Sequence, residues 1–211
     1  MTTLVEYLRR FNRKERFYLV GWALGRQAFE LDDAFRKSLA EETGLEIPSD
    51  AFVAMDYHLN WIHAAIHLMA CGCGKDVHEN SSALVVGKST QMIEGNQEDI
   101  DLVVAFASDG AYRLIAIEAK GDSPWDRVQL ERKVQRLDNT LRGSADGSID
   151  PYLVLASPKR PSNIDASKWP TWATEGGSLR WIRMPWPPLQ TVFRCDENGK
   201  KSSQSRYWSL R

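Results

Sequence analysis

The sequence contains little cysteine and no long hydrophobic run. Its three cysteines are Cys71, Cys73 and Cys195, an odd and sparse set that argues against a disulfide framework and favours a reducing cytoplasm. Charged residues interrupt the apolar stretches well before the ~20 residues that a transmembrane helix needs. The N-terminal segment lacks a signal-peptide pattern. We therefore expect a cytoplasmic protein without a membrane partner.

A strong net charge and a P-loop are also missing. The 27 basic and 28 acidic residues leave a net charge of −1, so the overall charge does not identify a nucleic-acid-binding protein. The absence of a P-loop ATP-binding motif excludes a motor of that type in this chain. From residue 158 onward, however, ten Lys and Arg residues stand against four acidic residues. This basic segment favours either contact with a phosphate backbone or a solvated surface.

The strongest structural pattern is a β-hairpin within residues 97–122. Two runs rich in Val, Ile and Leu, Ile100–Ala107 and Tyr112–Lys120, flank the dipeptide Asp109-Gly110. That dipeptide is a strong signal for a two-residue turn. Near-continuous apolar runs are typical of strands that are covered on both faces. The sequence therefore predicts a hairpin at the centre of a sheet.

Charged residues gather at the open end of this hairpin. If Asp109-Gly110 forms the turn, Asp101 lies opposite Glu118 and Asp99 lies opposite Lys120. Alternation then puts these side chains on one face. Like charges directly opposite each other are destabilising, and a divalent cation between the carboxylates would compensate them. A longer loop would shift the pairing. The two-residue turn predicts a cation site here.

The same residues resemble the motif of the PD-(D/E)xK nuclease superfamily. Asp101 is followed, after a gap of sixteen residues, by Glu118-Ala119-Lys120, and Ile100 stands where the motif has Pro. The resemblance implies an α/β, restriction-endonuclease-like fold with an αβββαβ core, whose mixed central sheet is flanked by helices. We expect this domain, with its basic, Trp-rich C-terminal segment, at residues 49–211. An N-terminal helical extension would pack on it from residues 1–48.

The resemblance also implies a metal-dependent active site. Asp101, Glu118 and the backbone carbonyl of Ala119 would bind Mg²⁺, with Mn²⁺ as a substitute, because hard cations prefer oxygen ligands. Lys120 would orient or deprotonate the attacking water and stabilise the developing charge. Lysine suits that role because its pKa responds to burial and to neighbouring charges.

Further residues are assigned to the site with weaker support. The resemblance gives Gln129, on the helix after the hairpin, a role in touching substrate or orienting Lys120, although Lys133 stands where a Tyr is expected. Asp99 would pair with Lys120 or join a second metal position. Asp56 would come from a helix before the first core strand. Other acids that could complete the site are Glu42, Glu94 and Glu98.

Periodicity and turn signals predict the remaining elements. We expect helices at 3–25, 32–43, 49–71 and 124–142, the last one capped by Ser123 with Pro124 at its first position. Strands are expected at 82–88, 152–156 and 179–183, and a further helix near 164–173. Tryptophans in the basic segment are interpreted as core or lid residues rather than as platforms for unpaired bases; they are Trp169, Trp172, Trp181, Trp186 and Trp208.

Histidines and cysteines provide a second metal hypothesis. His63 and His67 are four residues apart on a predicted helix, a spacing that can bind metal, although such a pair is more often an ordinary surface feature. Cys71-Gly-Cys73-Gly and His78 invite a zinc interpretation, but their spacing matches no common structural zinc site. A glycine-rich turn is the favoured interpretation.

These patterns support three hypotheses of different classes. The leading one is a Mg²⁺-dependent endonuclease that hydrolyses nucleic acid, with DNA ahead of RNA as substrate and a homodimer as one option. The alternative is a non-catalytic module of the same fold that binds nucleic acid or a protein partner in a repair or defence system. The third is an α/β domain in which Glu118 and Lys120 form an ordinary strand-end salt bridge.

Overall fold

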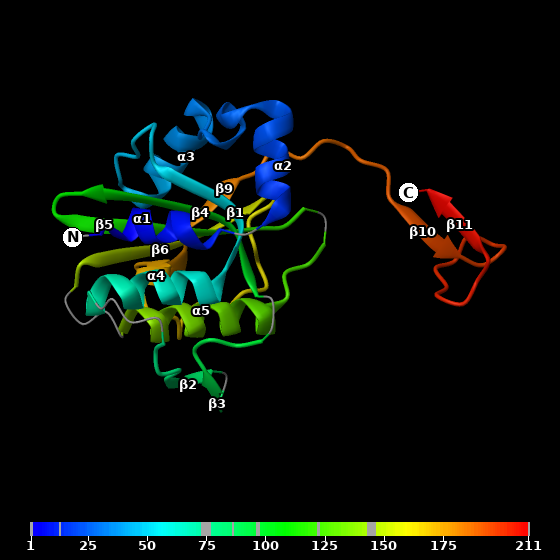
Figure 1. Cartoon of the computed structure of the whole chain (residues 1–211). Helices are drawn as coiled ribbons and strands as arrows, with labels where there is room; N and C mark the ends of the chain where they lie inside the picture. The colour runs from blue at the N-terminus through cyan, green and yellow to red at the C-terminus, as the bar shows by residue number, and fades with distance from the viewer. Residues whose placement is uncertain are drawn as a thin grey trace.

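The computed structural model describes residues 2–12, 14–72, 77–85, 87–95, 98–121, 123–142 and 147–210. It is a mixed α/β structure built on a five-stranded sheet of order β1-β4-β5-β6-β9 (Figure 1). β4 runs antiparallel to both of its neighbours, whereas β5, β6 and β9 are parallel. The strand bounds are β1 Phe52–His58, β4 Asp99–Ser108, β5 Ala111–Ala119, β6 Ile149–Ser157 and β9 Trp181–Arg183.

The central hairpin confirms the predicted turn and register. Asp109 and Gly110 both have positive φ, at 53° and 77°, as a two-residue hairpin turn of the primed type requires. The pairing runs from Ser108 opposite Ala111 to Leu102 opposite Ile117. This register brings the charged end of β4 beside the charged end of β5.

The predicted helix at 49–71 is wrong in its first half. Residues Phe52–His58 form β1, the edge strand that pairs with β4, and only Leu59–Cys71 form a helix, α4. Apolar residues spaced for a helix also fit a strand whose two faces are both covered. The helix begins only after His58, whose Nδ1 accepts a hydrogen bond from the backbone N–H of Asn60 (3.1 Å).

The predicted first core strand at 82–88 also lies elsewhere. Ser82–Val85 forms β2, which pairs with β3 (Lys88–Gln91) in a small two-stranded hairpin outside the central sheet. This hairpin lies below α4 and α5 in Figure 1. The chain therefore inserts α4 and the β2–β3 hairpin between the first and second strands of the sheet.

For the other helices, the C-terminal ends were predicted more accurately than the N-terminal ends. The single N-terminal helix expected at 3–25 is divided into α1 (Leu4–Phe11) and α2 (Glu15–Leu24). α3 (Asp33–Thr43) is capped by Asp32 and ends at Gly44 in the left-handed conformation, as predicted. α5 (Arg127–Arg142) ends as expected but begins later, after Asp126, whose carboxylate accepts from the Gln129 N–H at 3.0 Å.

Both faces of the sheet are covered. α1, α4 and α5 enclose the larger core on one face, and α3 covers the other face (Figure 1). Leu8, Ile66 and Leu137 pack in the larger core, whereas Leu39 and Ile115 belong to the smaller one. This double covering explains the near-continuous apolar runs of β4 and β5.

The C-terminal third contains little regular structure. The helix expected near 164–173 is wrong: Pro170 precedes a single 3₁₀ turn, η2 (Thr171–Ala173), and β7 (Thr174–Glu175) and β8 (Ser178–Leu179) follow. Trp169, Trp172 and Trp181 pack against the larger core, as predicted. A second 3₁₀ turn, η1 (Arg26–Phe29), follows α2 near the N-terminus.

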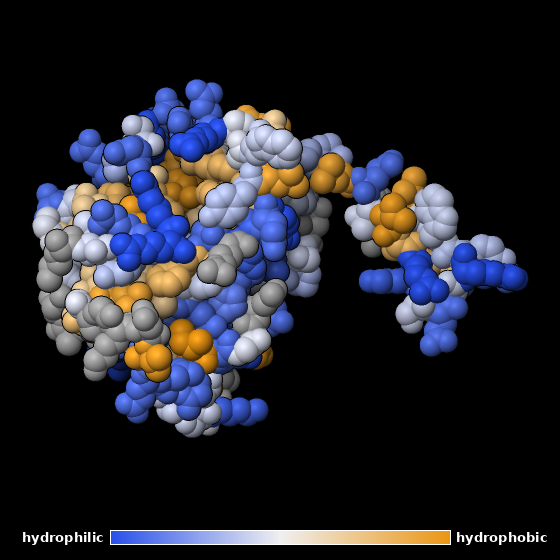
Figure 2. Space-filling model, in the orientation of Figure 1, coloured by the Kyte–Doolittle hydropathy of each residue, from blue (hydrophilic) through white to orange (hydrophobic). Residues whose placement is uncertain are grey.

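A separate C-terminal hairpin projects from the main body on an extended segment (Figure 1). It consists of β10 (Val192–Cys195) and β11 (Tyr207–Leu210). Figure 2 shows hydrophilic residues around a small hydrophobic surface on this hairpin. Trp208 of β11 is 65% exposed. In the described parts of the chain, no helix is long and apolar enough to cross a membrane.

Candidate active site at the end of the central hairpin

Three acidic residues form a row across adjacent strands. The pairs on either side of Asp56 in β1 place it opposite Asp101 in β4. One step beyond the pair of Leu102 and Ile117, the same register brings Asp101 opposite Glu118 in β5. Asp56 thus lies on the edge strand, not on the predicted helix, and its φ of 50° departs from the extended conformation of the residues around it. The row repeats the like-charge juxtaposition that the sequence predicted.

Asp101 is fixed to the end of β5. Its carboxylate accepts a hydrogen bond of 2.7 Å from the backbone N–H of Ala119. The next residue, Lys120, donates its own backbone N–H to the carbonyl of Ala156 in β6 (2.9 Å). The main chain of residues 118–120 is therefore held between two neighbouring strands, and the Asp101 carboxylate lies directly beside it.

Glu118 is a buried carboxylate with an unusual titration. Only 5% of the residue is exposed, and both carboxylate oxygens lie 2.7 Å from Nζ of Lys133 on α5. Burial raises the pKa of Glu118 from 4.5 to about 7; the Lys133 ammonium opposes this shift, and the negative charge of Asp101 adds to it. Glu118 therefore changes its charge near neutral pH, as acid–base and metal-binding groups often do.

Lys133 is the partner of Glu118 that the sequence pattern did not indicate. It lies four residues after Gln129, at the position where the resemblance expects a Tyr. The two residues differ in burial. Lys133 is buried and contacts Glu118, whereas Gln129, one turn earlier on α5, is exposed. The role given to Gln129 stays a prediction.

The N-terminal segment supplies two further cations. Nζ of Lys14 lies 2.7 Å from Oδ2 of Asp99, and the Arg16 guanidinium lies 2.8 Å from the carboxylate of Asp56. Asp99 therefore pairs with Lys14 instead of the expected Lys120. Its other oxygen, Oδ1, is buried without a hydrogen-bond partner among the described residues. The short basic run between α1 and α2 thus neutralises acids at the strand ends.

The remaining candidate acids have structural partners. Glu98 lies 2.7 Å from Arg136, and Glu94 lies 2.7 Å from Arg132, so both anchor α5. Glu42 on α3 accepts the backbone N–H of Trp181 in β9 at 2.6 Å. These contacts explain the three residues by packing, so none is needed to complete the strand-end cluster.

The aromatic side chain of Trp186 lies close to the same strand end. A Cβ atom added to Gly121 would stand 2.4 Å from the indole ring, so the glycine permits this close approach. Trp186 follows β9 on the extended segment that leads to the C-terminal hairpin, and it is partly exposed. An aromatic ring thus lies one residue beyond Lys120.

The described residues contain one group of three potential metal ligands whose ligand atoms all lie within 4.8 Å of one another, and it is not this acidic row. The group consists of His67, Cys71 and His78. His63 stacks beside His67, with ring centroids 6.1 Å apart, but does not join it. Cys73, named with Cys71 in the zinc hypothesis, lies outside the described residues.

Comparison with family models, with curated proteins and with solved structures gave no match to this chain.

Proposed function

We propose that this protein is a metal-dependent nuclease that hydrolyses phosphodiester bonds, with DNA as its first candidate substrate. One observation carries the proposal: the carboxylates of Asp101 and of the buried Glu118 come side by side at the end of two central strands, next to Lys120. This arrangement combines two carboxylates and a lysine where a substrate could approach.

The order of the elements supports the same proposal. α3, β1, β4, β5, α5 and β6 follow one another along the chain in the order expected for an αβββαβ core, if α4 and the β2–β3 hairpin count as an insertion. The Asp and the Glu-x-Lys pattern then fall on the second and third strands, as the resemblance to the PD-(D/E)xK superfamily implies. β1 replaces the strand at 82–88 in this assignment.

The donor set fits a hard divalent cation. Asp101 and Glu118 offer carboxylate oxygens, and the backbone of Ala119 lies between them in the hydrogen-bonded structure. The Lys133 ammonium lies 2.7 Å from both Glu118 oxygens, so a metal ion bound here would share or displace that contact. When bound, Mg²⁺ or Mn²⁺ would supply Lewis-acid polarisation of the scissile phosphate.

The remaining roles are assigned to residues of the protein itself. Lys133 holds the Glu118 carboxylate in one orientation and counteracts the effect of burial on its pKa. Lys120 follows the metal-binding positions directly, so its ammonium is assigned to orienting or deprotonating the attacking water and to stabilising developing charge. Basic residues of the C-terminal hairpin, such as Arg194 and Lys201, are suited to the substrate's phosphates.

The proposal is tested with a panel of plasmid, linear duplex, single-stranded DNA and RNA, each incubated with Mg²⁺, Mn²⁺ or EDTA. We expect cleavage that requires the metal and falls by about 10²-fold or more in Asp101→Asn and Glu118→Gln. Glu131→Gln is the matched control, because Glu131 is an exposed acid on α5. Equal cleavage by all four proteins would exclude this site as the catalytic centre.

A non-catalytic binding module is the second candidate. The observation in its favour is that Asp99, Asp56 and Glu118 are each neutralised by a basic side chain of the same chain. Such a module would bind nucleic acid in gel-shift or anisotropy measurements without cleaving it. Its affinity would not depend on Mg²⁺ and would be unchanged in Asp101→Asn.

A further inference from the structure

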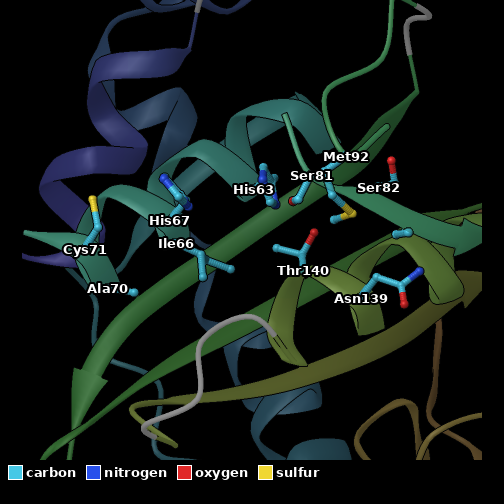
Figure 3. Close-up of a pocket in the computed structure, with 11 residues that line it drawn as sticks. His63, Ile66, His67, Ala70, Cys71, Ser81, Ser82, Met92, Asn139 and Thr140 are labelled. Atoms are coloured by element: carbon cyan, nitrogen blue, oxygen red, sulfur yellow. The ribbon is translucent and has the colours of Figure 1, made fainter. Parts of the chain in front are cut away.

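The end of α4 carries a second cluster of ligand atoms, which are nitrogen and sulfur instead of the carboxylate oxygens of the acidic row. His67 and Cys71 are four residues apart on α4 and therefore share a face of the helix, and Figure 3 shows both projecting from the same side. His78, in the segment before β2, reaches the same place. The ligand atoms of the three residues all lie within 4.8 Å of one another.

We propose that these residues bind one Zn²⁺ ion in the reduced protein. Imidazole nitrogen and thiolate sulfur are the ligands that zinc prefers, whereas Mg²⁺ and Ca²⁺ prefer oxygen. His67 Nε2 lies 3.2 Å from His78 Nδ1. Two nitrogens bound to one tetrahedral zinc at the usual bond length are about 3.3 Å apart, so these imidazoles are already spaced as a zinc site needs.

The separation of the two imidazole nitrogens also fits a direct hydrogen bond, so this distance alone does not distinguish a zinc site from a hydrogen bond. A hydrogen bond between His67 and His78 accounts for the two rings but does not involve the Cys71 sulfur, which lies within 4.8 Å of both ligand nitrogens. The zinc proposal accounts for all three residues together, and for the helical spacing of the first two. A fourth coordination position would remain for water or for another ligand, as in zinc sites with three protein ligands.

Cys71 forms a disulfide in the structure, and the zinc site requires its thiolate. Reduction by a phosphine converts the disulfide and one water molecule into two thiols and a phosphine oxide, which balances the two electrons transferred. The Cys71 thiol then loses its proton as it binds the metal. Zinc binding and the disulfide are therefore alternative states of the same sulfur.

The consequence of the site is local stability. His67 and Cys71 belong to the last two turns of α4, and His78 belongs to the segment that leads into the β2–β3 hairpin. Zinc would join the end of the helix to His78, much as a structural zinc site closes a loop. The inference does not depend on the proposed nuclease activity.

The test uses the full chain, reduced with a phosphine, loaded with Zn²⁺ and dialysed before metal analysis by mass spectrometry. We expect about one zinc per chain in the wild type and loss of most of it in His67→Ala, Cys71→Ser and His78→Ala. His63→Ala and Cys195→Ser are matched controls, since they remove a neighbouring histidine and the buried free cysteine; both should retain the metal.

Cobalt substitution and thermal unfolding give independent readouts. With Co²⁺ the wild type should show the intense visible bands of a tetrahedral site and a sulfur-to-cobalt charge-transfer band, which Cys71→Ser should lose. Chelation should lower the melting temperature of the wild type and not that of His78→Ala. The proposal is overturned if the reduced wild type retains no zinc, or if the three ligand variants retain as much as the controls.

Discussion

Two polar clusters of this protein differ in chemistry, burial and origin. The strand-end cluster contains Asp56, Asp101 and Glu118, drawn from three adjacent strands, and basic side chains from α2 and α5 pair with two of them. The α4 cluster contains His67, Cys71 and His78, which are half-buried or exposed and are drawn from one helix and its following segment. The first gathers hard oxygen ligands and the second gathers nitrogen and sulfur.

The comparison teaches that cation preference follows from where the ligands come from. A row of like charges is costly unless a positive group compensates it, and α2 and α5 supply guanidinium and ammonium partners even without metal. Neutral imidazoles carry no such cost and can gather at an exposed helix end. We therefore expect Mg²⁺ or Mn²⁺ at the first cluster and Zn²⁺ at the second.

The largest expected effect concerns catalysis at the strand-end cluster. Lys120→Ala should lower the rate of Mg²⁺-dependent cleavage by about 10²–10⁴-fold, because it removes the group assigned to the attacking water. Lys120→Arg keeps the charge and should retain part of the stabilisation but not the proton transfer. Lys37→Ala, at an exposed position on α3, is the control. An unchanged rate in Lys120→Ala would remove this residue from the mechanism.

The next effect concerns the buried ion pair. Lys133→Met leaves the Glu118 carboxylate buried without its cation, so the free energy of unfolding at pH 8 should fall by about 3–5 kcal/mol. Urea denaturation measures this loss. The double variant Glu118→Gln with Lys133→Met should recover most of it, since no buried charge remains. If the single variant is as stable as the wild type, the pair contributes nothing to the fold.

The same variant sharpens the comparison between the two clusters. With Lys133 removed, Mn²⁺ can take over the compensation of Glu118, so the ion should raise the melting temperature of Lys133→Met more than that of the wild type. Zn²⁺ at one equivalent should prefer the α4 cluster and produce no such difference. Equal shifts with both metals would mean that the two clusters are not distinct in their preference.

A smaller effect is expected from pH. The pKa of Glu118 is about 7 in the folded protein and 4.5 as its ordinary value, so the unfolded chain loses this proton first as pH rises. Stability should therefore fall between about pH 4.5 and pH 7, by on the order of 2–3 kcal/mol relative to Glu118→Gln. Denaturation at several pH values measures the difference. Parallel stability curves for the two proteins would contradict the assignment.

The smallest effect is expected when a variant of one cluster is assayed for the function of the other cluster. His78→Ala should change the cleavage rate by no more than about two-fold, because the two clusters lie on different elements and independent sites behave additively. Glu118→Gln should leave the zinc content unchanged. If His78→Ala abolished cleavage, the two clusters would have to be treated as one functional unit.

Local patterns predicted the hairpin and several helix ends correctly. The turn at Asp109-Gly110, the register that follows from it and the stop at Gly44 depend on the conformations of a few neighbouring residues. Such local preferences are readable without knowledge of the fold. The row from Asp101 to Glu118 was predictable for the same reason, because it follows from the turn alone.

Long-range contacts decided what the sequence could not. Phe52–His58 fits a helix by apolar spacing, yet it became an edge strand because its backbone pairs with β4, more than forty residues later in the chain. Ser82–Val85 has the composition of a core strand, yet it pairs with β3 outside the central sheet. Propensity is a weak guide when the pairing partner is distant.

By itself, the sequence determined that two apolar strands meet in a tight turn and bring acidic residues together at their open end. Only the tertiary structure decided which positive groups compensate those acids: Lys133 from α5, and Lys14 and Arg16 from the N-terminal segment. The physical reason is range. Turn geometry acts between neighbours in the chain, whereas the burial that shifts the pKa of Glu118 and the ion pairs that oppose it arise only when distant elements pack together.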